Sequence, residues 1–260
     1  MIPDQRELRE LLDFAVALAR DAGAITHSYF KGSFVAERKA DNSFVTVADR
    51  EAERHLRARI ERAFPDDAIL GEEEGEKPGT SGRRWILDPV DGTYSFVHGV
   101  PLYGVLIGLE IDGEPSVGVV NLPSLDELVC GARGLGCLWN NRTARVSSTD
   151  VLGEALLLAT DFGTCERYGF GRAVEKLQRS VGARRTWGDC YGHVLVATGR
   201  ADIMLDPVMN AWDSAALLPI VEEAGGTFTD WRGERTIHGG NAISTNRALF
   251  NEVMQAIKES

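Results

Sequence analysis

The sequence predicts an α/β protein of two lobes, with an α+β lobe at residues 1–147 and an α/β lobe at residues 148–260. Two observations lead to this prediction. Apolar stretches at 102–111 and 115–122 flank Asp112-Gly113, a strong hairpin signal, and so begin an antiparallel meander in the first lobe. In the second lobe, stretches typical of strands alternate with stretches typical of helices, as they do in α/β folds.

Two amphipathic helices are expected before the meander. Over residues 5–30, apolar side chains recur at helical spacing and indicate a helix with one buried face. The same spacing predicts a second helix over residues 47–64. Asp49 lies in its first turn, where the helix dipole favours an anion, so charge stabilisation alone would account for this residue. Between the two helices, Asp41-Asn42-Ser43 is typical of a turn.

The other elements are predicted from apolar runs and turn residues. In the first lobe we expect strands at 68–70, 85–87, 127–131 and 136–139. In the second lobe we expect strands at 155–160, 184–186, 201–205 and 226–229, and helices near 170–180, 190–198, 212–224 and 247–258. Because Pro89 cannot donate to a strand ladder, the strand that begins at Trp85 should end in a turn there.

Charge and cysteine usage exclude several classes of protein. A net charge of −11 disfavours nucleic acid and anionic membranes as partners. No apolar run approaches the ~20 residues that span a bilayer, and we expect no secretory signal, because the N-terminus lacks a basic stretch followed by an apolar one. The four cysteines form no C-x-x-C pair, which favours free thiols in a reducing compartment. We therefore expect a cytoplasmic protein.

The stretch from Trp85 to Thr93, which reads WILDPVDGT, carries the strongest chemical signal. Asp88 and Asp91 would repel each other on a tight turn, and a hard cation such as Mg²⁺ would relieve this repulsion through oxygen ligands. The N–H groups of Gly92 and Thr93 could bind an anion beside the metal. A metal beside an anion indicates phosphate chemistry. On local grounds, Asp88 and Asp91 are equally well explained as ordinary turn residues.

Two further acidic residues follow or begin predicted elements. Glu72 comes directly after the strand at 68–70, much as Asp88 follows the strand at 85–87, so parallel strands would bring both to one site. The alternative is a solvated acidic loop. Asp213 begins the helix at 212–224, where the ordinary interpretation is an N-cap, and an N-cap is compatible with a ligand role.

Four ordered blocks of the sequence resemble the inositol monophosphatase superfamily, whose members are Mg²⁺-dependent, lithium-sensitive phosphomonoesterases. The blocks are Gly71-Glu72-Glu73, Trp85 to Thr93, Trp212-Asp213-Ser214-Ala215-Ala216 and Glu223-Ala224-Gly225-Gly226. Asp41 and the segment Val45 to Asp49 match the N-terminal signature. The resemblance covers nearly the whole chain. It implies a layered α-β-α-β-α sandwich with the site at the junction of the lobes, and a homodimer.

The resemblance also implies a role for individual residues. Two or three Mg²⁺ ions would be held by the side chains of Glu72, Asp88, Asp91 and Asp213 and by the backbone carbonyl of Val90. The nucleophilic water would be held by Asp49, Glu72 and Thr93. The phosphate would be bound by the N–H groups of Gly92 and Thr93. These metal ions would offset the acidic charge that otherwise disfavours an anionic substrate.

A second-lobe segment, Arg184 to Gly192, resembles the histidinol-phosphatase branch of this superfamily and implies hydrolysis of histidinol phosphate in histidine biosynthesis. Histidinol phosphate carries an ammonium and an imidazole. The substrate-binding set that we expect is Gly92, Thr93, Arg185, Asp189, Asp206 and Asp213. Asp189 and Asp206 would pair with the ammonium, Arg185 would contact the phosphate or an opposing carboxylate, and Trp187 and Tyr191 would pack against the imidazole.

Several alternatives remain open on the sequence alone. Asp189 is equally well explained as the N-cap of the helix at 190–198, and Trp187 and Tyr191 as core residues. The substrate could instead be inositol 1-phosphate or another sugar phosphate. A binding protein that senses phosphoinositides or nucleotides on an inactive phosphatase fold is disfavoured, because such a protein should have lost at least one of the acidic residues.

Overall fold

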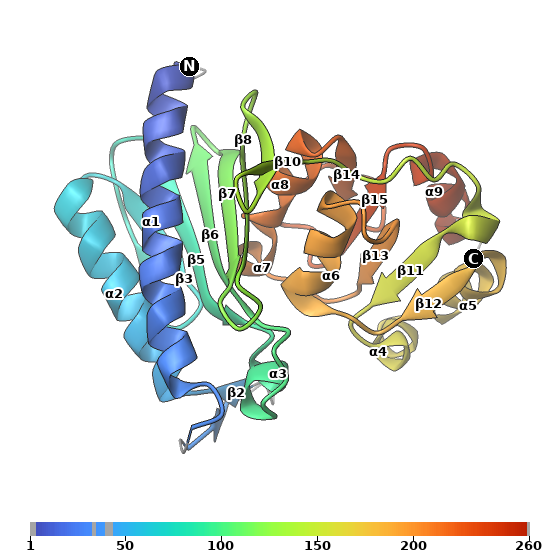
Figure 1. Cartoon of the computed structure of the whole chain (residues 1–260), viewed down its shortest axis with the longest axis horizontal. Helices are drawn as coiled ribbons and strands as arrows, with labels where there is room; N and C mark the ends of the chain where they lie inside the picture. Colours follow the sequence, from blue (N-terminus) through green and yellow to red (C-terminus); the bar gives the residue numbers. More distant parts are fainter. Residues whose placement is uncertain (1–3, 33–34, 40–43, 259–260) are drawn as a thin grey trace.

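The two long helices of the first lobe form where the sequence predicts them. Residues 4–32, 35–39 and 44–258 are described by the computed structural model of the chain, and the turn predicted at 41–43 lies outside them. α1 (Gln5–Tyr29) and α2 (Val47–Ala63) confirm the two amphipathic predictions. Both helices lie on one face of the first sheet (Figure 1).

The first sheet is an antiparallel meander extended by two strands, one parallel to the meander strand beside it and one antiparallel to that added strand. Within the described residues its eight strands are, in spatial order, β10 (Arg142–Ala144), β9 (Gly136–Trp139), β8 (Glu127–Ala132), β7 (Glu114–Leu122), β6 (Gly104–Ile111), β5 (Arg83–Asp91), β3 (Ala68–Gly71) and β4 (Gly75–Lys77). The predicted hairpin is confirmed, since Asp112 and Gly113 have φ of 52° and 78°, which suits a tight two-residue turn. β3 and β5 run parallel to each other. A separate ribbon pairs β1 (Glu37–Arg38) with β2 (Phe44–Val45).

The turn expected at Pro89 is wrong, because β5 continues to Asp91 through a β-bulge. The register with β6 shifts between the pairs Asp88–Leu106 and Asp91–Gly104, so β5 contains one extra residue there. β3 pairs with β5 only as far as Leu87. A proline is tolerated beyond that point because bulges and strand edges do not require its missing N–H.

The second sheet is mixed. Its strands are, in order, β12 (Ala183–Arg185), β11 (Leu156–Ala159), β13 (Ile203–Asp206), β15 (Ala242–Asn246) and β14 (Gly226–Thr229). Its helical elements are η1 (Leu152–Glu154), α4 (Phe162–Arg167), α5 (Gly171–Ser180), α6 (Asp189–Ala197), α7 (Ala211–Ser214), α8 (Leu217–Glu223) and α9 (Phe250–Lys258). The helix expected at 212–224 is broken into α7 and α8, because Pro219 has no N–H to bond the carbonyl of Ala215.

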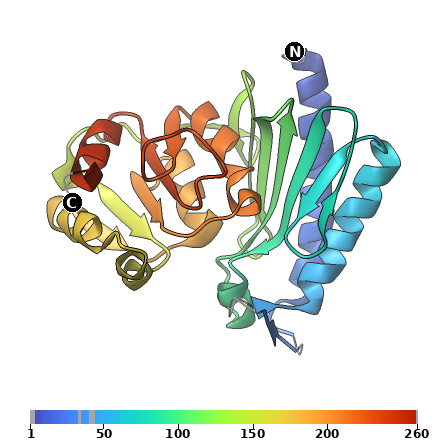
Figure 2. The same cartoon turned by 180° about the vertical axis from the view of Figure 1, so that it is seen from behind.

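The elements stack in five layers. α1 and α2 cover the outer face of the first sheet, α6 and α8 lie between the two sheets, and α5 and α9 cover the outer face of the second (Figures 1 and 2). The α-β-α-β-α architecture implied by the resemblance is therefore confirmed. Among the described residues no helix is long and apolar enough to cross a membrane.

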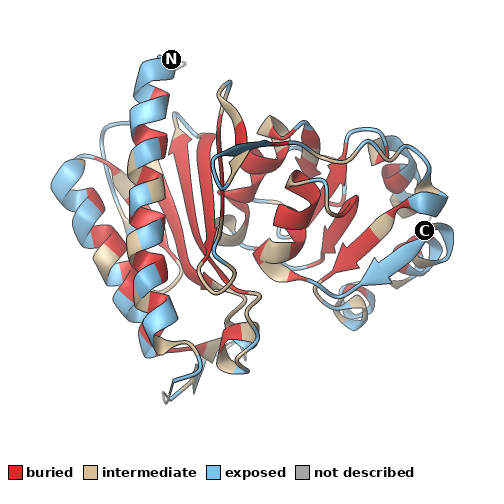
Figure 3. Ribbon diagram, in the orientation of Figure 1, coloured by how far each residue is buried: buried red, intermediate tan, exposed pale blue. Residues whose placement is uncertain are grey.

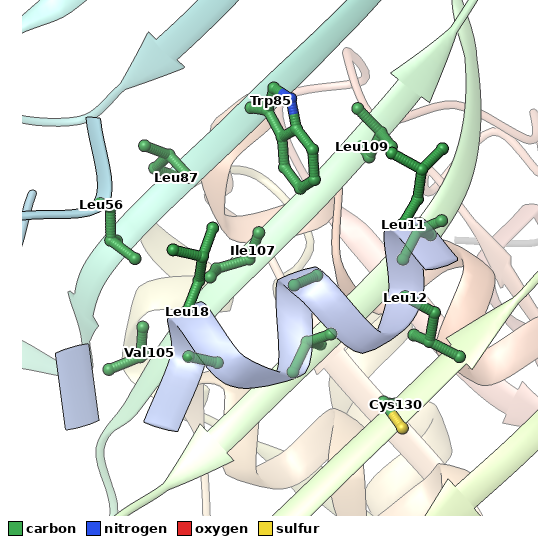
Figure 4. Close-up of a cluster of buried hydrophobic side chains, with 14 of the residues drawn as sticks. Leu11, Leu12, Leu18, Leu56, Trp85, Leu87, Val105, Ile107, Leu109 and Cys130 are labelled. Carbon is green, nitrogen blue, oxygen red and sulfur yellow. The ribbon is translucent and has the colours of Figure 1, made fainter. Parts of the chain in front are cut away.

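Buried residues lie on the faces where these layers meet (Figure 3). One cluster joins Leu18 of α1 and Leu56 of α2 to Trp85 and Ile107 of the first sheet (Figure 4). Burying a large apolar side chain of this kind stabilises the fold by about 1.5–3 kcal/mol. A second cluster packs the other face of the first sheet against α6 and α8, so the two lobes share a core.

Candidate active site

Three carboxylates meet where the two lobes join. Asp88 and Asp91 lie at the end of β5 and Asp213 lies in α7, and one oxygen of each is within 4.8 Å of the others. Side chains three residues apart in a regular strand point to opposite faces of the sheet. The extra residue of the bulge instead lets the side chains of Asp88 and Asp91 reach the same cluster. Asp88 also accepts the Val90 N–H at 3.0 Å, which satisfies an amide inside the bulge.

Glu72 reaches the same edge of the sheet from the neighbouring strand. In the parallel pair of β3 and β5, Gly71 lies opposite Leu87, so Glu72 and Asp88 come next on adjacent strands. The Glu72 N–H donates to the Leu87 carbonyl at 3.2 Å. The prediction that parallel strands bring Glu72 and Asp88 to one edge is therefore confirmed.

The carboxylates of this cluster repel one another in a buried setting. Burial, and then the charge of Glu72, raises the pKa of Asp88 well above its usual value. Burial and the charge of Asp189 do the same for the pKa of Asp91. Burial raises the pKa of Asp213 to about 7. A set of buried and partly buried carboxylates that repel one another fits a hard divalent cation, whose binding would remove the repulsion.

Asp49 and Glu72 have further features that suit a cation site. Asp49 completes a capping box of α2, in which its Oδ2 accepts from the N–H and the hydroxyl of Thr46 at 2.8 and 2.5 Å. Its Oδ1 is buried and has no hydrogen-bond partner among the described residues. The Glu72 carboxylate already attracts a cation, because the ammonium of Lys39 lies 2.7 Å from its Oε1. Burial raises the pKa of Asp49 to about 6.

Asp213 belongs to a helix start, as one interpretation of the sequence expected, but it is not the N-cap itself. Asn210 is the N-cap of α7, and Asp213 is the third helical residue, whose Oδ2 accepts the Asn210 N–H at 2.6 Å. This capping box fixes the side chain while Asp213 still contributes an oxygen to the carboxylate cluster.

Gly92 forms the sharp turn from β5 into α3 (Thr93–Val97). Its φ of 79° lies in the left-handed region, and a Cβ there would lie 2.9 Å from the Leu102 carbonyl and 3.1 Å from Asp189 Oδ2. The Thr93 hydroxyl donates to the Val90 carbonyl at 2.9 Å. Its hydrogen is thus engaged, and its oxygen can accept a further hydrogen bond.

A cavity of about 230 Å³ opens from the cluster into the second lobe. Its lining combines four carboxylates with hydroxyl and apolar groups: Asp91, Thr160, Thr164, Asp189, Cys190, Asp206, Pro207, Val208, Met209 and Asp213. The Thr160 hydroxyl accepts the Asp189 N–H and donates to Asp206 Oδ2, both at 2.9 Å. Burial raises the pKa of Asp189 to about 6.

The interpretation of Asp189 as a helix N-cap is wrong. Gly188 is the N-cap of α6 and Asp189 is the first helical residue, with a left-handed φ of 52°. Few residues other than glycine adopt this conformation, although Asp tolerates it better than most. The Asp189 side chain therefore lines the cavity, and the next amide, that of Cys190, donates to Asp91 Oδ2 at 2.5 Å.

Arg185, Trp187 and Tyr191 lie apart from this cavity lining. Arg185 is exposed on β12, where its guanidinium donates to the Arg184 carbonyl and lies 6.0 Å from the Trp187 ring centroid. Trp187 is 41% exposed, so its interpretation as a core residue is wrong. Tyr191 packs against two buried clusters, in keeping with the core interpretation.

Three groups of the site were not predicted from the sequence: Lys39, Thr160 and the amide of Cys190. Thr160 follows the parallel strand β11, and sites of open α/β sheets gather at the carboxyl ends of such strands, so its position carried a usable signal. Nothing local in the sequence marks Lys39 or the Cys190 amide, because both act through contacts distant along the chain.

Comparisons with known proteins identify a family and several relatives. The model of the inositol monophosphatase family matches residues 7–260. A histidinol-phosphatase of Chlorobaculum parvum is 44% identical over 95% of this chain and 96% of its own length, and one of Mycobacterium tuberculosis is 40% identical over 94% and 96%. The crystal structure of the extragenic suppressor protein SuhB from Bartonella henselae superposes with a TM-score of 0.89 at 29% identity, over 96% of this chain and 99% of that one.

Proposed function

Because this chain belongs to the inositol monophosphatase family and is a phosphatase, we propose that it hydrolyses L-histidinol phosphate to L-histidinol and phosphate with Mg²⁺ as its cofactor. The observation that carries this proposal is the pair of carboxylates in the cavity beside the acidic cluster, the partly buried Asp189 and the buried Asp206. A cation on the substrate is the natural partner for that pair, and inositol has none.

Glu72, Asp88, Asp91, Asp213 and the Val90 carbonyl are the proposed ligands of two or three Mg²⁺ ions. The close approach of three of these carboxylates and the orphaned oxygen of Asp49 support a site for cations. When bound, Mg²⁺ supplies charge neutralisation for the phosphate oxygens and lowers the pKa of water. Oxygen ligands in near-octahedral arrangement are what Mg²⁺ requires.

The proposed nucleophile is a water molecule held by Asp49, Glu72 and Thr93. The Thr93 hydroxyl gives its hydrogen to the Val90 carbonyl, so its lone pairs can accept from that water. Asp49 and Glu72 are proposed to orient the water and to accept its proton. The N–H groups of Gly92 and Thr93 are proposed to bind the phosphate. The buried thiol of Cys190, whose pKa is raised well above its usual value by burial, is not used as a nucleophile.

Substrate recognition is proposed to extend from the cluster into the second-lobe cavity. Asp189 and Asp206 would pair with the ammonium of histidinol phosphate, and Asp213 would contact the substrate beside the metal. The proposed role of Arg185 requires its exposed side chain to turn toward the cavity from β12. A carboxylate that pairs with a buried cation discriminates strongly against a neutral group, because the unpaired carboxylate would remain desolvated.

The proposal includes a cellular setting and partners. We propose a cytoplasmic homodimer that acts in histidine biosynthesis and binds neither nucleic acid nor membranes. The four cysteines are all buried free thiols, which fits a reducing compartment. The net charge of −11 disfavours polyanionic partners.

Phosphate release from histidinol phosphate, inositol 1-phosphate and fructose 1,6-bisphosphate, with and without Mg²⁺, tests the proposal. We expect Mg²⁺-dependent turnover and a kcat/KM for histidinol phosphate at least 100-fold above the others, which is roughly 2.7 kcal/mol of transition-state discrimination. If inositol 1-phosphate were preferred, as the family name suggests, the role of Asp189 and Asp206 would be refuted. Absence of Mg²⁺-dependent turnover on all three would refute the proposed cofactor and substrates together.

A further inference from the structure

Glu53 of α2 is a fully buried carboxylate to which none of the roles above gives a function. Its Oε2 accepts the N–H of Glu73 at 2.8 Å, and its Oε1 accepts the N–H of Glu74 at 3.0 Å. These are the two amides that directly follow Glu72. One side chain of a long helix therefore binds the turn that carries a proposed metal ligand.

Arg57, one helical turn further along α2, completes this arrangement. Its Nε donates to Glu53 Oε1 at 2.8 Å, and its Nη2 donates to the Gly75 carbonyl. Gly71 permits the close approach, because a Cβ at this position would overlap the Glu53 carboxylate. Together the two side chains bind the peptide groups of three successive residues, 73–75.

A buried ion pair is a costly way to pack a helix. Desolvation of both charges consumes most of the Coulomb attraction, and apolar residues of similar size would commonly stabilise such a position at least as well. What an ion pair adds is the directionality of its hydrogen bonds, because a carboxylate accepts hydrogen bonds only from donors that point toward it. In this chain the donors are the amides of the turn after β3, where Glu72 leaves the sheet.

From these contacts we propose that Glu53 and Arg57 are positioning residues, which hold the turn at residues 72–74 so that the Glu72 carboxylate faces the cluster of Asp88 and Asp213. They would thereby set the affinity of the site for a divalent cation. This inference rests on the proposed function, and on Glu72 as a ligand in particular.

The test compares Glu53→Gln with Glu61→Gln, which makes the same chemical change at an exposed position of the same helix. In the metal-free proteins, hydrogen exchange at the amides of Glu73 and Glu74 should be at least tenfold faster in Glu53→Gln, with exchange in β5 to β7 unchanged. Calorimetric titration with Mg²⁺ should show at least tenfold weaker binding by Glu53→Gln. Glu61→Gln should match the unchanged chain within twofold in both measurements.

The other outcomes separate a failure of this inference from a failure of the fold or of the proposed cofactor. If the Glu53→Gln variant folds and binds Mg²⁺ as tightly as the wild-type chain, the inference is overturned. If Glu53→Gln does not fold, the double variant Glu53→Gln/Arg57→Met, which leaves no buried charge unpaired, takes its place with the same expectations. Failure of both variants to fold would make the pair a requirement of the fold and not a positioning device. If the wild-type chain itself bound no Mg²⁺, the proposed cofactor would be refuted and this inference with it. If only the inference were wrong, the wild-type chain would still bind Mg²⁺, so the two failures are distinguishable.

Discussion

Asp91 shows how single residues tie the site together. Its carboxylate comes from the first lobe. It accepts a hydrogen bond from the Cys190 N–H at the start of α6, in the second lobe. Thr160 has a similar role within the second lobe, because its one hydroxyl bonds both the Asp189 amide and the Asp206 carboxylate. The acidic cluster and the cavity are thus connected by a continuous set of hydrogen bonds and contacts across the junction.

The raised pKa of Asp213 predicts how the metal-free protein responds to pH. The pKa of Asp213 in the folded chain is about 7, above the usual 3.8. The stability that the protonated Asp213 carboxyl contributes is therefore full below pH 3.8 and is lost as the pH rises through 7. At pH 8 without metal, Asp213→Asn should therefore raise the melting temperature by about 2 °C or more, since 1 kcal/mol corresponds to roughly 2–4 °C in a chain of this size.

Calorimetric or fluorescence melting curves at pH 5 and pH 8, in the presence of a chelator, check this prediction. The gain from Asp213→Asn should be smaller at pH 5, where the native carboxyl is largely protonated. An equal gain at both pH values would contradict the account, since it would attribute the effect to packing and not to charge.

At the scale of elements, the sequence was most informative where a pattern is local. The hairpin at Asp112-Gly113 and the two amphipathic helices depend on turn chemistry and helical period, and the structure confirms them. β15, β4, β10 and α4 were not predicted, because short elements owe their existence to neighbours far along the chain. The bulge at Pro89 also depends on a distant part of the chain. Proline marks an irregularity in the strand, and only the pairing of β5 with β6 makes that irregularity a bulge and not a turn.

The same limit applies to the site. The acidic residues were recognised because their spacing within the WILDPVDGT stretch and around Glu72 and Asp213 is local or resembles a family pattern. The left-handed conformation of Asp189, the exposure of Trp187 and the ion pair of Lys39 are consequences of packing between elements. No local pattern reports them.

The packing of α8 on the first sheet predicts that two glycine substitutions differ in cost, because one would cause a severe overlap and the other only a tight contact. A Cβ at Gly118 of β7 would overlap the carbonyl of Ala216, whereas a Cβ at Gly131 of β8 would lie 3.3 Å from the nearest atom, Ile220 Cα. Gly118→Ala should cost about 1–3 kcal/mol of unfolding free energy, as overpacked cores do. Gly131→Ala is the matched control and should cost less, as urea unfolding of both variants would show. A larger loss from Gly131→Ala would contradict this description of the interface.

At the scale of the whole molecule, the acidic cluster takes residues from both lobes. Asp88 and Asp91 come from the first sheet and Asp213 from the second lobe, and the core beneath them is shared. We propose that residues 1–147 and 148–260 are the two units that this junction joins. A cation bound between them would link the lobes as well as serve the reaction.

Mg²⁺ should therefore stabilise the folded chain as a whole. At 100 times its dissociation constant, a ligand bound only by the folded state adds about 2.7 kcal/mol. This corresponds to a rise in melting temperature of roughly 5–10 °C. Na⁺ at matched ionic strength should produce little of this rise, and Asp213→Asn should reduce it by more than half. A melting temperature that does not respond to Mg²⁺ would speak against a cation site at the junction.

The most direct test of the account is the kcat/KM of Asp189→Asn on histidinol phosphate and on inositol 1-phosphate, with Mg²⁺ present. The account predicts a loss of about 100-fold or more on histidinol phosphate, because its ammonium loses a partly buried carboxylate partner, and less than threefold on inositol 1-phosphate. An equal loss on both substrates would contradict it, since Asp189 would then support the structure of the site and not the choice of substrate.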